Sequence, residues 1–173
     1  TQKQQKSGAD SPQEGISTLR LRAEREGGAT SKVRLGLRAD GEPSAKGRDW
    51  IAPPSRFSAL SLRAVRSRTS SGRQQMLARD VKTATEDGTS FDLRLRSVQQ
   101  RPVTITAENV AALGDREVRL VNAKTDRVFD LRKKDEITIR PSDESTALTL
   151  LTGTESYVRD QQNRLTASKL DMQ

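Results

Sequence analysis

The amino-acid sequence predicts an all-β fold: an antiparallel β-sandwich of about ten short strands, followed by a short C-terminal helix. Apolar and polar residues alternate with period two in many short runs, which is typical of strands that bury one face. Clusters of Gly, Pro, Asn, Asp and Ser separate these runs and predict turns. Hydrophobic residues make up 32% of the chain and aromatic residues only 3%, so we expect a thin, aliphatic core.

Five runs in the first part of the chain predict strands: residues 19–23, 33–39, 57–65, 76–81 and 90–96. The segment between the first two runs contains a Gly-Gly pair and predicts a hairpin turn. Residues 40–55 break the rhythm with two glycines and three prolines around Trp50, the only tryptophan. We expect a loop of this length to cover an open end of the sheet or to contact a partner.

Four further runs lie close together between Pro102 and Arg140, and we expect them to pair as one antiparallel unit around which the chain is organised. They cover residues 103–107, 118–121, 128–131 and 137–139. The short polar segment 122–126 predicts the hairpin loop between the second and third of these runs. The sequence therefore predicts an antiparallel unit of four strands within about forty residues.

The composition divides the chain into three parts. Residues 1–15 are polar, have no apolar run and predict a flexible arm or linker. Residues 16–152 carry the strands, either as one sandwich or as two halves, 16–100 and 101–152. Because the chain starts at Thr1 rather than Met, we expect it to be a processed or excised piece.

The third part is a polar tail over residues 153–173, which follows a last predicted strand at 148–151. Val158 and Leu165 stand seven residues apart in this tail, with Gln and Arg between them. This spacing predicts a short surface helix over 154–165. Such a helix would depend on docking for its stability.

Cysteine and histidine are absent from the sequence. Their absence excludes zinc sites with thiolate or imidazole ligands, cysteine nucleophiles and mechanisms that need an imidazole base. The carboxylate pairs Asp135-Glu136 and Asp143-Glu144 lie in predicted turns beside basic residues, which favours solvated charges over a general acid or base. We therefore expect no enzymatic activity, no cofactor and no metal site. No apolar run approaches the roughly 20 residues of a membrane helix, so we also expect no membrane span.

The net charge of +8 is concentrated in the first part of the chain. Residues 1–100 carry 19 Lys and Arg against 11 Asp and Glu, whereas residues 101–173 carry 12 of each.

Trp50 is interpreted as a plug that closes the end of the sandwich or, less favoured, as a loop contact for a partner. Seven arginines occupy the polar positions of predicted strands, and we expect them to form an outward basic face: Arg20, Arg22, Arg34, Arg38, Arg63, Arg94 and Arg96.

The basic face has several interpretations. Arginines on one surface neutralise phosphates and would bind nucleic acid. However, three Phe, one Tyr and one Trp offer few stacking surfaces for bases, and no helix-turn-helix or RNA-binding signature is present. We favour a solvated face that also keeps edge strands from pairing with other chains. An acidic partner protein or an anionic polysaccharide would suit the same arginines.

Residues 47–54 read Gly-Arg-Asp-Trp-Ile-Ala-Pro-Pro and follow a Val-Arg-Leu-Gly-Leu strand. Strand runs at 77–81, 91–95 and 103–131 come after them. These stretches resemble the Gly-x-Asp-x-x-x-Pro-Pro segment and the β-region that precede the type IX secretion sorting signal in large secreted and surface proteins of Bacteroidetes-type bacteria. The resemblance covers about residues 30–151.

This resemblance implies a non-catalytic immunoglobulin-like or FlgD-like module. It also implies export and an extracellular or cell-surface location in a Gram-negative bacterium. The function that follows is an interaction module that anchors, assembles or presents a surface protein or complex, through a protein partner or through self-assembly. The polar tail stands where the sorting signal of those proteins is expected.

Overall fold

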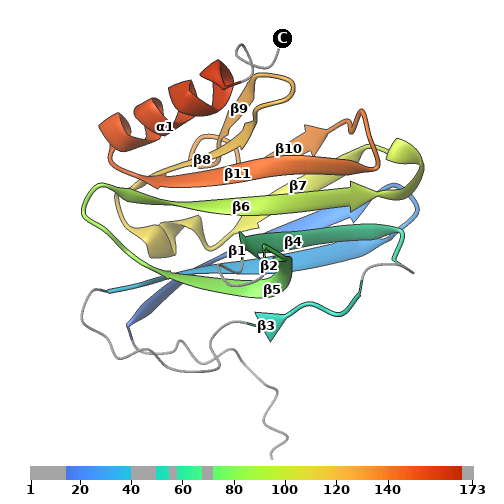
Figure 1. Ribbon diagram of the computed structural model, residues 1–173, viewed down its shortest axis with the longest axis horizontal. Coiled ribbons are helices and arrows are strands. Elements are labelled where there is room, and N and C mark those ends of the chain that lie inside the picture. The colour runs from blue at the N-terminus through green and yellow to red at the C-terminus, as the bar shows by residue number, and fades with distance from the viewer. Residues whose placement is uncertain (1–14, 40–49, 55–57, 68–71, 169–173) are drawn as a thin grey trace, which may run out of the picture.

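The computed structural model describes residues 15–39, 50–54, 58–67 and 72–168 of the chain (Figure 1). The predicted flexible arm, apart from Gly15, lies outside the described residues, and so does most of the predicted loop 40–55. The same holds for the first three residues of the Gly-Arg-Asp-Trp motif and for the last five residues of the tail.

Eleven strands and one α-helix occupy most of the described chain, which confirms the prediction of a largely β protein with a C-terminal helix (Figure 1). Two short 3₁₀ helices, Val98–Gln100 and Val110–Leu113, precede and follow β7. The elements are β1 (Ile16–Arg25), β2 (Thr30–Arg38), β3 (Trp50–Ile51), β4 (Leu60–Ser67), β5 (Gln74–Thr83), β6 (Gly88–Ser97), β7 (Val103–Glu108), β8 (Glu117–Asn122), β9 (Arg127–Asp130), β10 (Glu136–Ile139), β11 (Ser145–Gly153) and α1 (Glu155–Ala167).

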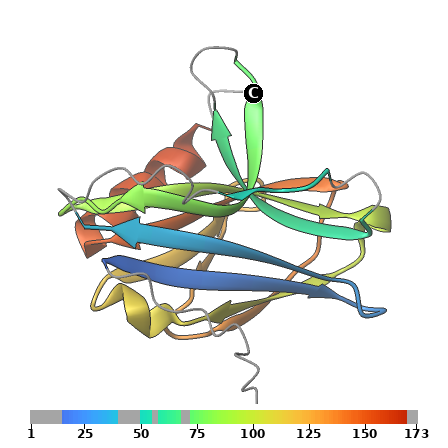
Figure 2. The ribbon, with the colours of Figure 1, turned by 90° about the horizontal axis from the view of Figure 1, so that it is seen from below.

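The strands form one continuous sheet in the order β10-β7-β1-β2-β5-β4-β6-β11-β8-β9, and β3 pairs with β5 beside this path. The sheet curls into a nearly closed barrel (Figure 2). This differs from the predicted antiparallel sandwich, because neighbouring strands are hydrogen-bonded along the whole path and because β2 and β5 run parallel. Alternation reveals which face of a strand is buried, but it does not distinguish one curled sheet from two stacked sheets.

The prediction that the four strands between Pro102 and Arg140 pair as one unit is wrong. The predicted hairpin of β8 and β9 is present, but β7 pairs with β1 and β10, whereas β8 pairs with β11 and β9. The four strands therefore lie in two pairs at opposite ends of the sheet order. Nearness in sequence favours pairing but does not determine it, and here the long-range ladder between β1 and β7 prevails.

A single aliphatic cluster fills the inside of the curled sheet. Leu21, Leu62, Leu95 and Leu120, from four different strands, have no exposed surface. Phe91 is the only aromatic side chain among the buried members of this cluster in the described chain. The thin, aliphatic composition of the sequence thus corresponds to a core of interlocking leucine, isoleucine and valine side chains.

Strand β5 changes partner halfway along its length. Its first half pairs with the end of β4 and its second half pairs with β2. The end of β4 and the start of β5 leave the sheet together as a projecting hairpin (Figure 2). Where β5 has left, β2 and β4 are joined by Ser31, whose Oγ accepts hydrogen bonds from the backbone N of Leu62 and from Nη1 of Arg63, both at 2.9 Å.

Helix α1 covers the outside of β8 and β11 (Figure 1). Thr154 caps its first turn, because the hydroxyl of Thr154 accepts a hydrogen bond from the backbone N of Tyr157 at 3.2 Å. Val158 is fully buried against Val121 and Leu151. The predicted helix is confirmed, and its docking provides the stability that an isolated helix of this length lacks.

Candidate functional site

The seven arginines of the predicted basic face all occupy outward positions of their strands, and all are half-buried. They come from β1, β2, β4 and β6. Because the sheet curls, these residues do not form a single flat face. They fall into one group on β1 and β2 and a second group on β4 and β6, and the two groups meet where Arg63 contacts Ser31 and Lys32 of β2.

The first group contains a row of cations that crosses three strands. Arg20 faces Arg34 across the β1–β2 ladder, and Arg34 faces Arg79 across the parallel β2–β5 ladder. At the end of the row, Nη1 of Arg20 forms an ion pair with Oε2 of Glu108 at 3.3 Å. Sequence analysis missed Arg79, although residues 56–79 contain six arginines and no acidic residue.

The other two arginines of the first group are held by neighbours. Nη2 of Arg22 lies 3.3 Å from Oε2 of Glu24, and Nη2 of Arg38 donates a hydrogen bond to Oγ1 of Thr83 at 3.1 Å. The first contact runs along β1, whereas the second crosses from β2 to β5. Arg22 and Arg38 therefore flank the row without joining it.

Trp50 lies on the outer side of the sheet over the end of this row. Its ring centroid is 5.4 Å from the guanidinium carbon of Arg34 and 5.6 Å from that of Arg79, which are cation–π distances. The side chain of Trp50 is 49% exposed, and the adjacent Ile51 is 69% exposed. The interpretation of Trp50 as a plug that closes the end of a sandwich is therefore wrong. It is part of the outer surface, held there by pairing between Trp50 and Arg79 on β3 and β5.

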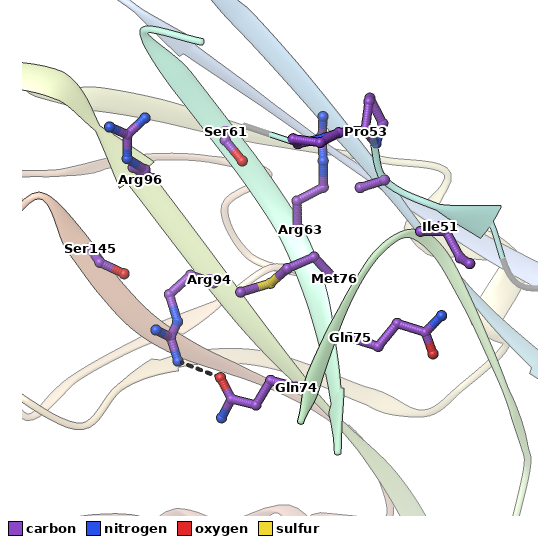
Figure 3. A pocket seen from close by; sticks show the side chains of 12 residues that line it. Ile51, Pro53, Ser61, Arg63, Gln74, Gln75, Met76, Arg94, Arg96 and Ser145 are labelled. Atoms are coloured by element: carbon purple, nitrogen blue, oxygen red, sulfur yellow. Dashed lines mark hydrogen bonds between the residues drawn. The ribbon is translucent and has the colours of Figure 1, made fainter. Parts of the chain in front are cut away.

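The second group lines a pocket of about 520 Å³ beneath the projecting hairpin, which we call the arginine pocket (Figure 3). One wall is formed by residues 51–54, the hairpin supplies Gln74, Gln75 and Met76, and the outer faces of β4, β6 and β11 supply the floor. The floor residues are Ser61, Arg63, Arg94, Arg96 and Ser145.

Arg63 and Arg94 face each other across the β4–β6 ladder. Nη1 of Arg63 donates to Oγ of Ser31 and to the carbonyl of Leu62, both at 2.9 Å, and Nη2 of Arg94 donates to Oε1 of Gln74 at 3.4 Å. All these acceptors are neutral. Burial lowers the pKa of the Arg63 guanidinium below its ordinary value, because burial penalises the charged form.

Arg96 belongs to the next row along the same floor. It faces Ser61 on β4 and Ser145 on β11. Its Nη1 donates to the carbonyl of Ser58 at 3.1 Å. Figure 3 shows Arg94 and Arg96 approaching the pocket from one side, with Pro53 and Ile51 on the other.

Chemically, the arginine pocket combines three guanidinium groups with two serine hydroxyls, two glutamine amides and an apolar wall of Ile, Ala, Pro and Met side chains. No acidic side chain is among its described lining residues. Guanidinium groups donate paired hydrogen bonds to carboxylates and phosphates, so this arrangement suits an anionic ligand. The sequence could not reveal the pocket, because its wall and floor come together only where β5 leaves the sheet.

The acidic residues offer no comparable site. Asp135, Glu136, Asp143 and Glu144 are all exposed, and Asp143 pairs with Lys124. In the described ranges of the chain, no three acidic side chains gather closely enough to hold a metal ion. Across the same ranges, no helix has both the length and the apolar character needed to cross a bilayer.

The candidate functional site thus consists of the surface around Trp50 and the adjacent arginine pocket, which share Ile51. Comparison of the chain with protein-family models, with curated proteins and with solved structures finds no match to any of them.

Proposed function

We propose that this protein is a non-catalytic interaction module, and that a partner protein docks on the outer surface formed by Trp50, Ile51 and Arg34, with Arg79 buried against the Trp50 ring. We call Trp50, Ile51 and Arg34 the Trp50 surface. In line with the resemblance of residues 47–54 to secreted surface proteins, we further propose that the module is exported. At the cell surface it would anchor, assemble or present a surface protein or complex.

The observation that carries the proposal is the exposure of Trp50 and Ile51. They are the only large hydrophobic side chains that are exposed in the described part of the chain. Trp and Arg are the residues that most often dominate binding energy at protein interfaces, and charged residues surround the apolar centre there. The two arginines also restrict the Trp50 ring before binding, which reduces the entropy lost on association.

Trp50→Ala tests this function in an attachment assay with labelled protein on the cells that produce it. We expect attachment to weaken by about 30-fold or more, because a central interface tryptophan typically contributes at least about 2 kcal/mol. The melting temperature should change little, since Trp50 lies outside the core. Arg127→Gln on the distant β9 is the control and should attach normally. Normal attachment of the Trp50 variant would refute the proposed docking surface.

A second candidate, nucleic-acid binding, is favoured by the row of Arg20, Arg34 and Arg79 across three strands. Arg20 and Arg34 are half-buried and would neutralise phosphates, whereas Arg79 is only 8% exposed. The test is the affinity for a labelled duplex and a labelled single strand between about 50 and 200 mM salt. Binding that persists at the higher salt would favour this candidate, and no binding at the lower salt would eliminate it.

A further inference from the structure

We propose that the arginine pocket binds an acidic peptide segment of the partner protein, with carboxylates paired to Arg94 and Arg96 and an apolar side chain against residues 51–54. This inference deepens the proposed function and rests on it in one respect, because it takes the ligand to be part of a protein. It assigns a ligand chemistry to a pocket that lies beside the Trp50 surface.

The first argument is the close approach of two cations, Arg63 and Arg94, on the floor of the pocket. Arg63 and Arg94 are directly opposed, and like charges at opposed positions of a ladder destabilise a sheet. All the acceptors described for these two guanidinium groups are neutral oxygens. Their Nε atoms are buried without a hydrogen-bond partner among the described residues. A bound carboxylate would supply the missing negative charge where water is partly excluded.

The second argument is the spacing of the cations. Arg94 and Arg96 are two residues apart on β6, so they project from the same face about 7 Å apart along the strand. Carboxylates at alternate positions of an extended peptide have the same spacing. The planar guanidinium fork matches the two oxygens of a carboxylate, which adds geometric selectivity to charge.

The third argument distinguishes a peptide from other polyanions. The lining includes the apolar residues Ile51, Ala52, Pro53, Pro54 and Met76, and Figure 3 shows Ile51 and Pro53 across the pocket from Arg94 and Arg96. A peptide that alternates acidic and apolar residues satisfies both sides, whereas a polysaccharide leaves the apolar wall without a partner. Single-stranded nucleic acid stacks its bases on aromatic side chains, and the described lining has none. The hairpin glutamines provide amides for the peptide backbone.

The test measures fluorescence anisotropy of the full chain with a labelled peptide that alternates glutamate and valine. The double variant Arg94→Gln/Arg96→Gln should bind this peptide at least about 10-fold more weakly, because two charge-assisted contacts are lost. The matched control is Arg127→Gln/Arg164→Gln, which removes the same charge from exposed positions on β9 and α1. We expect the control to stay within about 3-fold of the wild type, because exposed charges beyond about 8 Å are screened at physiological salt.

A variant that keeps both charges distinguishes a loss of binding from a loss of folding. Arg94→Lys/Arg96→Lys preserves both cations but not the planar fork, so its affinity should lie between those of the wild type and the glutamine variant. Circular dichroism melting of each variant establishes that it is folded. If the glutamine variant is unfolded, weaker binding by the folded lysine variant supports the pocket, and unchanged binding by it overturns the pocket.

Three results would overturn the inference. The first is no binding of the peptide at low salt. The second is an equal loss of peptide affinity in both glutamine variants, which would indicate that the peptide responds to the overall positive charge and not to the pocket. The third is tighter, Arg94-dependent binding of a sulfated oligosaccharide or a single-stranded oligonucleotide, which would identify another occupant. A different measurement tests the proposed function, namely the cell attachment of the Trp50→Ala variant. Failure of the proposed function can therefore be distinguished from failure of this inference. Peptide binding through Arg94 with normal attachment of that variant would retain the pocket and refute the Trp50 surface.

Discussion

Arg66 and Asp80 form an ion pair that ties the projecting hairpin to the body of the sheet. Nη2 of Arg66 contacts Oδ1 of Asp80, and the Asp80 side chain has no exposed surface. Nη2 of Arg66 also donates to the carbonyl of Val81 at 3.2 Å. The pair lies where β5 changes from β4 to β2 as its partner, so it holds the hairpin that roofs the arginine pocket.

Removal of the buried carboxylate should therefore destabilise the protein. Asp80→Ala removes the buried member of the pair, and because the side chain of Arg66 is 38% exposed and stays hydrated, the loss should be about 1–3 kcal/mol. Chemical denaturation measures the loss. Asp92→Ala is the control, because Asp92 is exposed on β6 and should change the free energy of unfolding by under about 0.5 kcal/mol. Equal, small effects of both changes would show that the ion pair does not support the fold.

Ser31 should contribute measurably although it is a single hydroxyl. In Ser31→Ala the backbone N of Leu62 loses its acceptor in a buried position, and an unsatisfied buried donor costs about 1–3 kcal/mol. Ser67→Ala, at the exposed end of β4, removes the same atom and should be nearly neutral. Thermal or urea denaturation compares the two variants. A Ser31 variant as stable as the control would mean that water replaces the hydroxyl at this seam.

Leu120 tests the assignment of strand faces. It is fully buried in the central cluster, so Leu120→Ala should destabilise by about 2–5 kcal/mol through lost apolar contact and a residual cavity. Thr138→Ala, an exposed change on β10, serves as the control. Denaturant unfolding gives both values. A loss below about 0.5 kcal/mol for Leu120→Ala would contradict the inward orientation of this residue.

Position 88 requires a glycine because the ring of Tyr157 lies directly against its Cα atom. A Cβ atom at Gly88 would clash with this ring and would lie 2.7 Å from the carbonyl oxygen of Thr152. Gly88→Ala should cost about 1–3 kcal/mol through overpacking and should expose α1 to protease before the rest of the chain. Addition of Tyr157→Ala should relieve part of this cost, and the double-mutant cycle measures the coupling. Additive effects would exclude the contact between Gly88 and Tyr157.

The sequence predicted local features well, because period-two alternation depends only on which side chains are buried. The outward positions of Arg94 and Arg96, the hairpin of β8 and β9, and the C-terminal helix with Val158 are all present in the structure. These features are encoded within a few residues of each other. The prediction of an aliphatic interior also follows directly from the residue types.

Strand pairing was not predictable, because it is determined by contacts between distant segments. Nothing near β2 in the sequence indicates that its second half pairs in parallel with β5. The arginine pocket depends on that pairing, since Met76 and residues 51–54 reach Arg94 only through the hairpin. Trp50 was misinterpreted for the same reason: its place over Arg34 and Arg79 requires β3 to pair with β5.

The pairing of β1 with β7 has a consequence for the order of events during synthesis. Arg20 and Glu108, which face each other in this ladder, are separated by 88 residues. The ribosome therefore releases β1 and β2 long before β7 emerges to cover the other side of β1. During that interval the backbone donors and acceptors of β1 are available to other nascent chains, and contacts of high sequence separation form slowly. Chaperone engagement of the nascent chain should consequently persist until β7 has left the exit tunnel.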